Sequence, residues 1–329
     1  DTATVTIQLL ASDGTNFGYS PGALTFGAAS SGSISNIVNN NDGSYRFTYT
    51  TGSGVGNITF TPTLAGSALS QGQIHVNVRK DTDSFLNLNG TNQYAKVAAA
   101  TSFSGFSSFS AEALVKPSSS ATTGDYIILG KEAEFLLALR AGGDYGATGN
   151  SVSLQINYAL YPNYNGTGWA WISTGVAVPQ NVWSHIAFVK SGNLVSVYLN
   201  GTLVYSNTST IYAATTSPTS GTYATPTNIT ANSTYTFGIG VRGIGGTLSG
   251  YFPGAIDEVH LYNTAITQSQ VLSDIAGATP CTTSGLIAYW DFNEGSGTTN
   301  YNLCPTNATV GASAYDLLLQ NSPTFSDAK

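Results

Sequence analysis

Apolar and polar residues alternate over many short segments of the chain, and Gly, Asn, Asp and Pro separate these segments. Alternation with a period of two places every second side chain on the same face of a β-strand. It is clearest in residues 4–9, 45–49, 74–78 and 195–199. The pattern predicts an all-β chain built from many short strands.

One segment predicts a helix. Thr267 and Gln270 have the spacing of a capping box, in which side chains satisfy the free backbone amides of the first helical turn. Ile266, Val271 and Ile275 can then share one helical face. We therefore expect a single short helix that starts at Thr267 and packs through these three apolar side chains.

Charged side chains are scarce, so solubility must come from hydroxyl and amide groups. They make up 8% of the 329 residues, against roughly 25% in an average globular chain. The net charge is −7, and the 10 basic residues are spread along the chain. No basic stripe is left to follow a phosphate backbone, so we expect no nucleic-acid partner.

The sequence contains no apolar run as long as the roughly 20 residues that a membrane helix needs. It starts at Asp1 without the basic and apolar regions of a signal peptide, and it has no methionine. We expect a secreted, already processed protein with no membrane span.

Two cysteines, Cys281 and Cys304, enclose a segment rich in Thr, Ser and Asn. A disulfide would close a loop of about 24 residues and contribute roughly 3 kcal/mol through the entropy of the unfolded chain. The alternative is two free thiols, and a metal site is disfavoured because His75, His185 and His260 lie far away in the sequence. We expect the disulfide, which indicates an oxidising compartment.

Near the N-terminus the sequence predicts a hairpin. Asp42 and Gly43 are expected to supply the positive φ angles of a tight turn, after which Tyr45, Phe47 and Tyr49 point to one face of a strand. Further strands are expected at residues 56–60 and 73–78.

These features resemble the immunoglobulin-like repeats of bacterial adhesins of the invasin and intimin type, with filamin-like traits. The resemblance covers residues 1–80 and implies an immunoglobulin-like sandwich that serves as a spacer or adhesive stalk. The polar stretch at 79–83 then predicts a semi-rigid link to the rest of the chain.

Five sequence motifs follow the link, and they occur in the order that is typical of one protein family. They lie at residues 86–97, 109–117, 183–190, 195–201 and 252–263. They resemble the laminin-G-like jelly roll, which is also pentraxin-like and concanavalin-like. The resemblance implies a β-sandwich over residues 81–329. Within it, residues 285–329 are expected to return and add edge strands, although they also resemble the opening of a second copy, whose open edge would take up a partner strand.

The same resemblance implies a calcium site. Relatives hold Ca²⁺ at the rim of a sheet, and Asp257 stands where they supply a carboxylate; Asn89 lies in a loop where they often have aspartate. A hard cation would accept these oxygens together with loop carbonyls. The alternative is that Asp257 only accepts hydrogen bonds within a turn.

A cluster of aromatic residues amid Pro, Asn and Gly predicts the sugar site. Sugars stack their apolar faces on aromatic rings while amides bind their hydroxyls. The candidates are Tyr158, Tyr161, Tyr164, Trp169 and Trp171. Trp169 and Trp171 can equally share the inner face of a strand, so Tyr161 and Tyr164 are the residues expected to be more exposed.

No catalytic constellation is evident. His185 follows a tryptophan and a serine in a predicted strand, which favours a structural role. The carboxylate pairs Glu132 with Glu134 and Asp257 with Glu258 do not match a glycanase signature, and direct neighbours point to opposite faces of a strand. We expect no enzyme.

Eight Asn-x-Ser/Thr sequons occur, a number close to the roughly six that so much Ser and Thr would give by chance. If the source organism glycosylates asparagine, the stretch from 206 to 236 holds the best acceptors. These are Asn207, Asn228 and Asn232.

The leading hypothesis is a noncatalytic surface adhesin or an extracellular structural subunit that forms a filament or sheath. The alternative is a carbohydrate-binding protein of a polysaccharide-processing system, and a glycanase ranks third. The expected partners are glycans or neighbouring surface proteins, with Ca²⁺ as the one candidate cofactor. Residues 1–9 and 315–320 are strand-like segments near opposite ends, so self-assembly by strand exchange is a further expectation.

Overall fold

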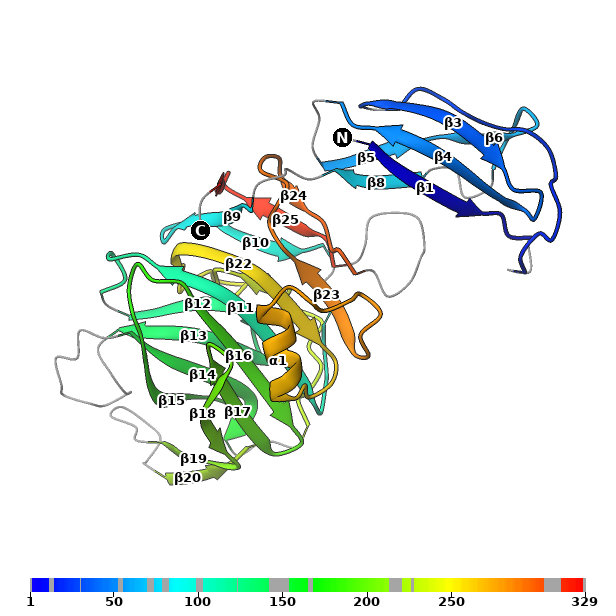
Figure 1. Cartoon of the computed structure of the whole chain (residues 1–329). Coiled ribbons are helices and arrows are strands. Elements are labelled where there is room, and N and C mark those ends of the chain that lie inside the picture. Colours follow the sequence, from blue (N-terminus) through cyan, green and yellow to red (C-terminus); the bar gives the residue numbers. More distant parts are fainter. Residues whose placement is uncertain are drawn as a thin grey trace. The chain divides into compact units, whose positions relative to one another are not determined.

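The chain forms two compact units that divide after residue 81. The structure, a computed structural model shown in Figure 1, describes the following residues: 2–11, 15–29, 31–52, 56–69, 74–78, 83–98, 103–122, 124–141, 154–164, 168–212, 221–225, 228–304 and 315–327. We call the units unit 1 and unit 2, and each is described by itself. Every strand pair described in them is antiparallel.

Unit 1 is built from short strands in three small sheets. They are ordered β1(Thr2–Gln8)-β4(Ser44–Thr50)-β3(Ser33–Asn39), β2(Leu24–Phe26)-β6(Pro62–Leu64)-β7(Ser67–Ala68) and β5(Gly56–Phe60)-β8(Ile74–Val78). The alternation in β4 buries Tyr45, Phe47 and Tyr49, as predicted. Phe47 and Tyr49 pack against Phe60, so β4 supplies the centre of the core.

The turn between β3 and β4 differs from the prediction in one respect. The positive φ angles belong to Asn41 (62°) and Gly43 (84°) rather than to Asp42. Asp42 instead accepts hydrogen bonds from the amide and the hydroxyl of Ser44, at 2.9 and 2.6 Å. A side chain at Gly43 would collide with the carbonyl of Phe17, so this position requires glycine.

Unit 2 is a sandwich of two eight-stranded sheets. Sheet I has the order β15(Gly168–Val178)-β14(Leu154–Tyr164)-β13(Phe135–Ala141)-β12(Gly124–Lys131)-β21(Gly238–Ile239)-β10(Tyr94–Val97)-β25(Leu317–Gln320)-β24(Thr299–Asn300). Sheet II has the order β18(Thr202–Asn207)-β17(Leu194–Leu199)-β16(Ser184–Ser191)-β11(Phe109–Pro117)-β22(Pro253–Tyr262)-β9(Phe85–Asn89)-β26(Thr324–Ser326), with β23(Leu286–Trp290) paired to β22. A separate hairpin is formed by β19(Ser209–Tyr212) and β20(Gly221–Ala224).

The core of unit 2 lies between the two sheets. Alternate residues of β13, among them Leu137 and Leu139, point into it from sheet I, and Ala111 and Phe188 point into it from sheet II. Trp290 of β23 is fully buried there and stacks on Phe237. The predicted all-β sandwich is confirmed.

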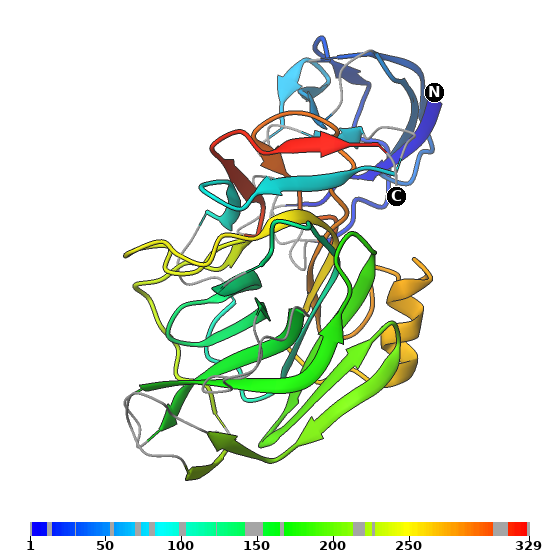
Figure 2. The same cartoon turned by 90° about the vertical axis from the view of Figure 1, so that its left-hand side faces the viewer.

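The last strands of the chain join both sheets beside the first strands of unit 2. β25 pairs with β10, and β26 pairs with β9. In Figure 2 the red C-terminal strands lie next to the cyan strands accordingly. Cys281, just ahead of this return segment, and Cys304 within it form the predicted disulfide.

The predicted helix is present as α1(Gln268–Ile275), and Thr267 caps it by accepting a hydrogen bond from the Gln270 amide. Its buried face differs from the prediction. Val271 and Asp274 are buried, whereas Ile275 is 44% exposed. Asp274 replaces an apolar residue because Tyr262 and Gln270 donate hydrogen bonds to its carboxylate.

Both terminal segments that were expected to exchange between molecules pair within their own unit. β1 is aligned with β4 along its full length, and β25 lies between β10 and β24. Strand exchange therefore stays a prediction. Among the helices of the described residues, none is both long and apolar enough to cross a membrane.

Candidate functional site

The outer face of sheet I, which points away from the core, carries polar side chains next to an indole. Register and alternation place the members of four adjacent strands side by side. They are Asp125 and Ile127 of β12, Leu136, Ala138 and Arg140 of β13, Gln155, Asn157 and Ala159 of β14, and Trp171 and Ser173 of β15. We call this surface the β12–β15 face.

Trp171 is the large aromatic residue of this face. Its ring packs against a small apolar cluster that includes Leu136 and Ala159, and Ala159 is its direct cross-strand neighbour. The guanidinium carbon of Arg242 lies 5.6 Å from the ring centroid, within the range of a cation–π contact. Trp171 remains partly exposed.

Arg242 is held in place from two sides. Its Nε and Nη2 donate to the two carboxylate oxygens of Glu132 at 2.8 and 2.6 Å, which is a bidentate ion pair. Its backbone forms an isolated bridge with Ser249. The turn between them requires Gly243, whose φ is 81° and where any side chain would meet the carbonyl of Thr247.

The rest of the face offers hydrogen-bonding groups. Arg140 and Asp125 form a second ion pair at 2.6 Å. The Ser173 hydroxyl donates to Gln155 at 2.9 Å, and the Asn157 amide donates to the Gln155 carbonyl at 3.0 Å. Asn157 is 1% exposed, and its Oδ1 accepts no hydrogen bond from the residues that the structure describes.

The structure divides the predicted sugar-site residues. Tyr158 points into the core and is fully buried, so its assignment to a sugar site is wrong. Tyr161 is partly exposed and follows Asn157 and Ala159 on the outward side of β14. Trp171 lies on the β12–β15 face as described. The side chains of the two remaining candidates, Tyr164 and Trp169, lie outside the described residues.

Glu132 and Glu134, the two glutamates considered as glycosidase carboxylates, both bind other groups of the protein. Glu132 binds Arg242, as described above. Glu134 is 2.9 Å from the Lys131 ammonium, and both side chains are buried. It also accepts hydrogen bonds from the amides of Gly105 and Asn232, at 2.8 Å each. These contacts show that Glu132 and Glu134 each take part in a structural ion pair. The other candidate carboxylates, Asp257 and Glu258, belong to a different cluster.

Three carboxylate groups come together at one place in unit 2. Ligand oxygens of Asp83, Asp257 and Glu258 all lie within 4.8 Å of one another. The prediction that Asp257 and Glu258 point to opposite faces is wrong, because the register of β22 against β11 shifts here and Glu258 has a φ of 49°. Such a β-bulge turns neighbouring side chains toward the same side.

The donor set of this acidic cluster fits a hard cation such as Ca²⁺, since it consists of carboxylate oxygens. Asp257 is fully buried, whereas Asp83 is exposed. Asn89 is not part of the cluster. It pairs with Pro253, four residues before Asp257, and its Oδ1 accepts hydrogen bonds from the amides of Thr91 and Asn92.

A buried polar cluster lies beneath α1 on the outer face of sheet II. Glu112 of β11 is the cross-strand neighbour of His260. The Nε2 atom of His185 is 3.8 Å from a Glu112 carboxylate oxygen. The Tyr262 hydroxyl donates to both oxygens of Asp274, at 3.0 and 2.9 Å. All these side chains are buried, so the cluster supports α1 rather than meeting a substrate.

Burial sets the protonation of this cluster. It raises the pKa of Glu112 well above its ordinary value, and the hydrogen bond to the nearby Asp274 carboxylate adds to this effect. Burial, followed by the charge of His260, lowers the pKa of His185 to about 4. Burial likewise lowers the pKa of His260. At neutral pH both imidazoles are therefore uncharged.

The sequon asparagines differ in exposure. Asn228 is exposed and Asn207 is partly buried. Asn232 is also partly buried, and its Oδ1 accepts hydrogen bonds from the amides of Thr234 and Tyr235. Glycosylation at these three positions stays a prediction.

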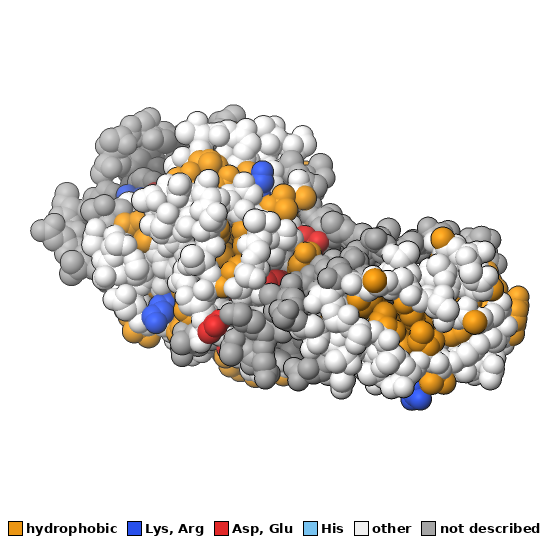
Figure 3. Space-filling model, turned by 90° about the horizontal axis from the view of Figure 1, so that it is seen from above, with side chains coloured by type: hydrophobic (Ala, Val, Ile, Leu, Met, Phe, Trp, Pro, Cys, Tyr) orange, Lys and Arg blue, Asp and Glu red, His pale blue; other side chains and the backbone are white. Residues whose placement is uncertain are grey.

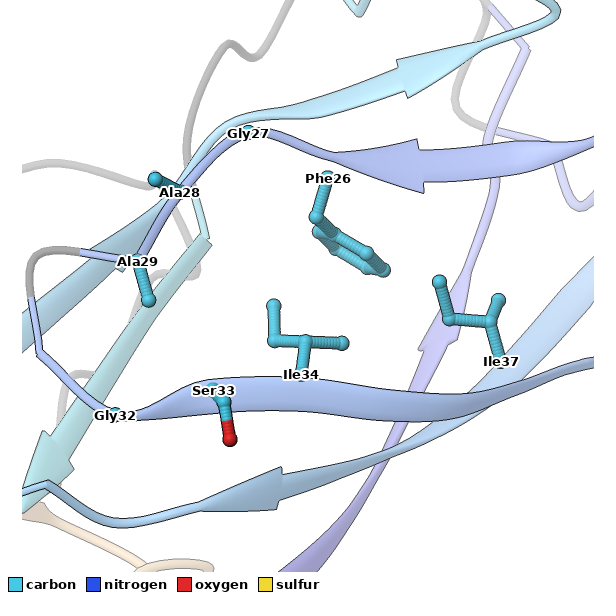
Figure 4. A pocket seen from close by; sticks show the side chains of 8 residues that line it. All are labelled: Phe26, Gly27, Ala28, Ala29, Gly32, Ser33, Ile34 and Ile37. Carbon is cyan, nitrogen blue, oxygen red and sulfur yellow. The ribbon is translucent and has the colours of Figure 1, made fainter.

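Unit 1 contains a pocket of about 320 Å³ beside β2 and β3. Phe26, Ile34 and Ile37 point toward one another across it (Figure 4), and the hydroxyl of Ser33 points away. Figure 3 shows a run of hydrophobic side chains over unit 1 and few charged side chains on the same view. The described residues that line the pocket are apolar or glycine except for Ser33.

The sequence of residues 89–272 matches a laminin-G-type family described as the concanavalin A-like lectin/glucanases superfamily. The chain belongs to this superfamily. The matched residues lie within unit 2 and include the whole β12–β15 face together with Glu132 and Arg242. The resemblance of unit 1 to bacterial immunoglobulin-like repeats stays a prediction. The sequence matches no curated protein.

Solved structures that are similar to this chain come from several organisms. A candidate carbohydrate-binding protein from Bacteroides ovatus aligns over 100% of this chain and 93% of its own, with 16% identity and a TM-score of 0.54. A heptameric SAP-like pentraxin from Limulus polyphemus aligns over 75% and 96%, with 15% identity and a TM-score of 0.46. Domain 4 of an extracellular arabinanase from Geobacillus stearothermophilus, solved with arabinotriose, aligns over 76% and 88%, with 17% identity and a TM-score of 0.32. The first likeness supports the fold, and the other two are too distant to carry an argument.

Proposed function

We propose that this protein is a noncatalytic carbohydrate-binding protein that acts outside the cell, with the β12–β15 face as its sugar site. The observation that carries the proposal is the setting of Trp171. This partly exposed indole lies beside an arginine–glutamate pair and close to the partly exposed side chains of Gln155 and Ser173. Aromatic stacking combined with such polar groups is how proteins bind saccharides.

Two further findings support the proposal. The similar protein from Bacteroides ovatus is a candidate carbohydrate-binding protein. The Cys281–Cys304 disulfide suits an oxidising, extracellular compartment.

The test is a binding titration of the purified chain against a panel of soluble polysaccharides, followed by Trp171→Ala. Loss of a Trp anchor from a binding site weakens affinity by at least about tenfold. Trp183→Ala is the matched control, because Trp183 is also a partly buried indole with a cation, the Lys116 ammonium, 5.9 Å from its ring. Equal losses in both variants, or binding that survives Trp171→Ala, would contradict the proposed site.

We also propose that the acidic cluster of Asp83, Asp257 and Glu258 holds a divalent cation, with Ca²⁺ as the first ion to test. A cation there would join Asp83, just ahead of β9, to β22. Its contribution would be to the stability of unit 2, because the cluster is not part of the β12–β15 face.

The wider role predicted from the sequence, a surface adhesin or filament subunit, is compatible with sugar binding and is tested separately. Concentration-dependent filaments in negative-stain images would support a structural subunit. A protein that stays monomeric at high concentration and binds glycans would support the carbohydrate-binding role and argue against the structural one.

A further inference from the structure

The cationic side chains described on or over the β12–β15 face are paired with carboxylates. Arg140 is 2.6 Å from Asp125, and Arg242 binds Glu132 through two hydrogen bonds. In the Arg242–Glu132 pair, the side chains are only 22% and 12% exposed. Solvent therefore screens these charges less than it would at an open surface.

The pairing matters for the kind of sugar that can approach Trp171. Acidic saccharides carry carboxylate or sulfate groups, which bind best to an arginine edge that presents two parallel donors. The Nε and Nη2 edge of Arg242 already faces the Glu132 carboxylate. A second anion at this place would meet the negative charge of Glu132 at short range.

The carboxylate of Glu132 does not repel an uncharged saccharide in this way. Its hydroxyl groups can donate to carboxylate oxygens and accept from guanidinium groups, and its apolar face can pack near the indole. From these contacts we propose that Glu132 restricts the sugar site to uncharged saccharides by neutralising Arg242. This inference rests on the proposed function and names the ligand class of the same site.

Glu132 can be tested because Arg242 has other supports. The bridge between Arg242 and Ser249 fixes the backbone, and the contact with Trp171 fixes the guanidinium. Glu132→Gln keeps the size of the side chain and removes its charge. We expect the variant to fold and to leave Arg242 above the indole without the negative charge of Glu132 beside it.

The experiment uses paired trisaccharides with the same backbone, a galactan with a galacturonan and a glucan with a glucuronan. Each is titrated against the full chain and its variants at low and moderate salt. We expect the wild type to bind a neutral member at least about tenfold more tightly than its acidic partner, and Glu132→Gln to shift this ratio toward the acidic partner by at least about tenfold. The shift should shrink as salt rises.

Two controls separate the possible failures. Asp327→Asn changes the net charge equally at an exposed carboxylate, so a shift of the same size there would overturn the role of Glu132. A wild type that binds acidic and neutral members equally, with both lost in Trp171→Ala, would also overturn the inference and leave the proposed function standing. Binding that is unaffected by Trp171→Ala would contradict the proposed function itself.

Discussion

Replacing Glu112 by glutamine should change how the stability of unit 2 depends on pH. Burial raises the pKa of Glu112 in the folded protein above its ordinary value of 4.5. The folded state therefore holds a proton that the unfolded state releases. The stability that this proton provides is complete below about pH 4.5 and is lost as the pH rises through the folded pKa. Glutamine can still donate a hydrogen bond to Asp274, and it cannot ionise.

The size of the effect follows from proton linkage. Each proton bound only by the folded state changes the free energy of unfolding by about 1.4 kcal/mol per pH unit. His185 acts in the opposite sense, because its pKa falls from 6.5 to about 4 and stability is lost as the pH drops between these values. Because both histidines are present in the wild type and in Glu112→Gln, the difference between the two proteins isolates the carboxyl of Glu112. From about pH 4.5 up to the raised pKa of Glu112 in the folded protein, the wild type should lose up to about 1.4 kcal/mol per pH unit relative to Glu112→Gln.

The assay is urea unfolding followed by tryptophan fluorescence from pH 5 to 9. All four tryptophans, Trp169, Trp171, Trp183 and Trp290, belong to unit 2, so the signal reports on this unit alone. His185→Gln is the companion variant, and it should reduce the loss of stability at acidic pH instead. If the curves of the wild type and Glu112→Gln run parallel over the whole range from pH 5 to 9, the folded state does not hold the Glu112 proton more tightly than the unfolded state and the reasoning fails.

Three other predictions concern stability. Replacing Cys281 and Cys304 by serine should destabilise unit 2 by roughly 3 kcal/mol through a freer unfolded chain; an unchanged urea midpoint would show that the return segment is held without the bridge. A chelator should lower the melting temperature of unit 2, and Asp257→Asn should abolish that sensitivity; a chelator effect that persists in the variant would move the cation elsewhere. Phe47→Ala should cost unit 1 about 3 to 5 kcal/mol because it empties a fully buried aromatic position. Its transition, followed by circular dichroism, should shift while the tryptophan signal does not, and a joint shift would argue against separate unfolding.

The elements that could be predicted are those whose sequence signal lies within their own few residues. The alternation in β4 predicts that Tyr45, Phe47 and Tyr49 share a buried face, and it needs no partner strand to be read. The capping residue Thr267 likewise marks the start of α1 through its own neighbours. Family landmarks extended this to the whole sandwich, since their order fixes which strands follow one another.

The site was less predictable because alternation defines two faces without saying which one is inside. Tyr158 and Trp171 are both aromatic and lie on adjacent strands, yet one points into the core and the other away from it. Glu132 and Arg242 are 110 residues apart, and only the folded chain brings them together. The bulge at Glu258 is a local backbone feature that strict alternation cannot anticipate.

The pairing of β26 with β9 has a consequence for how the protein emerges during synthesis. Asn87 of β9 and Ser326, which form a hydrogen bond, are separated by 239 positions. At ordinary translation rates the ribosome needs on the order of ten seconds or more to make the intervening chain. Unit 1 can be complete early in that interval, whereas β9 and β10 must wait for their C-terminal partners. During this time their apolar edges are open to wrong partners, so co-translational protection by a chaperone would matter more for unit 2 than for unit 1.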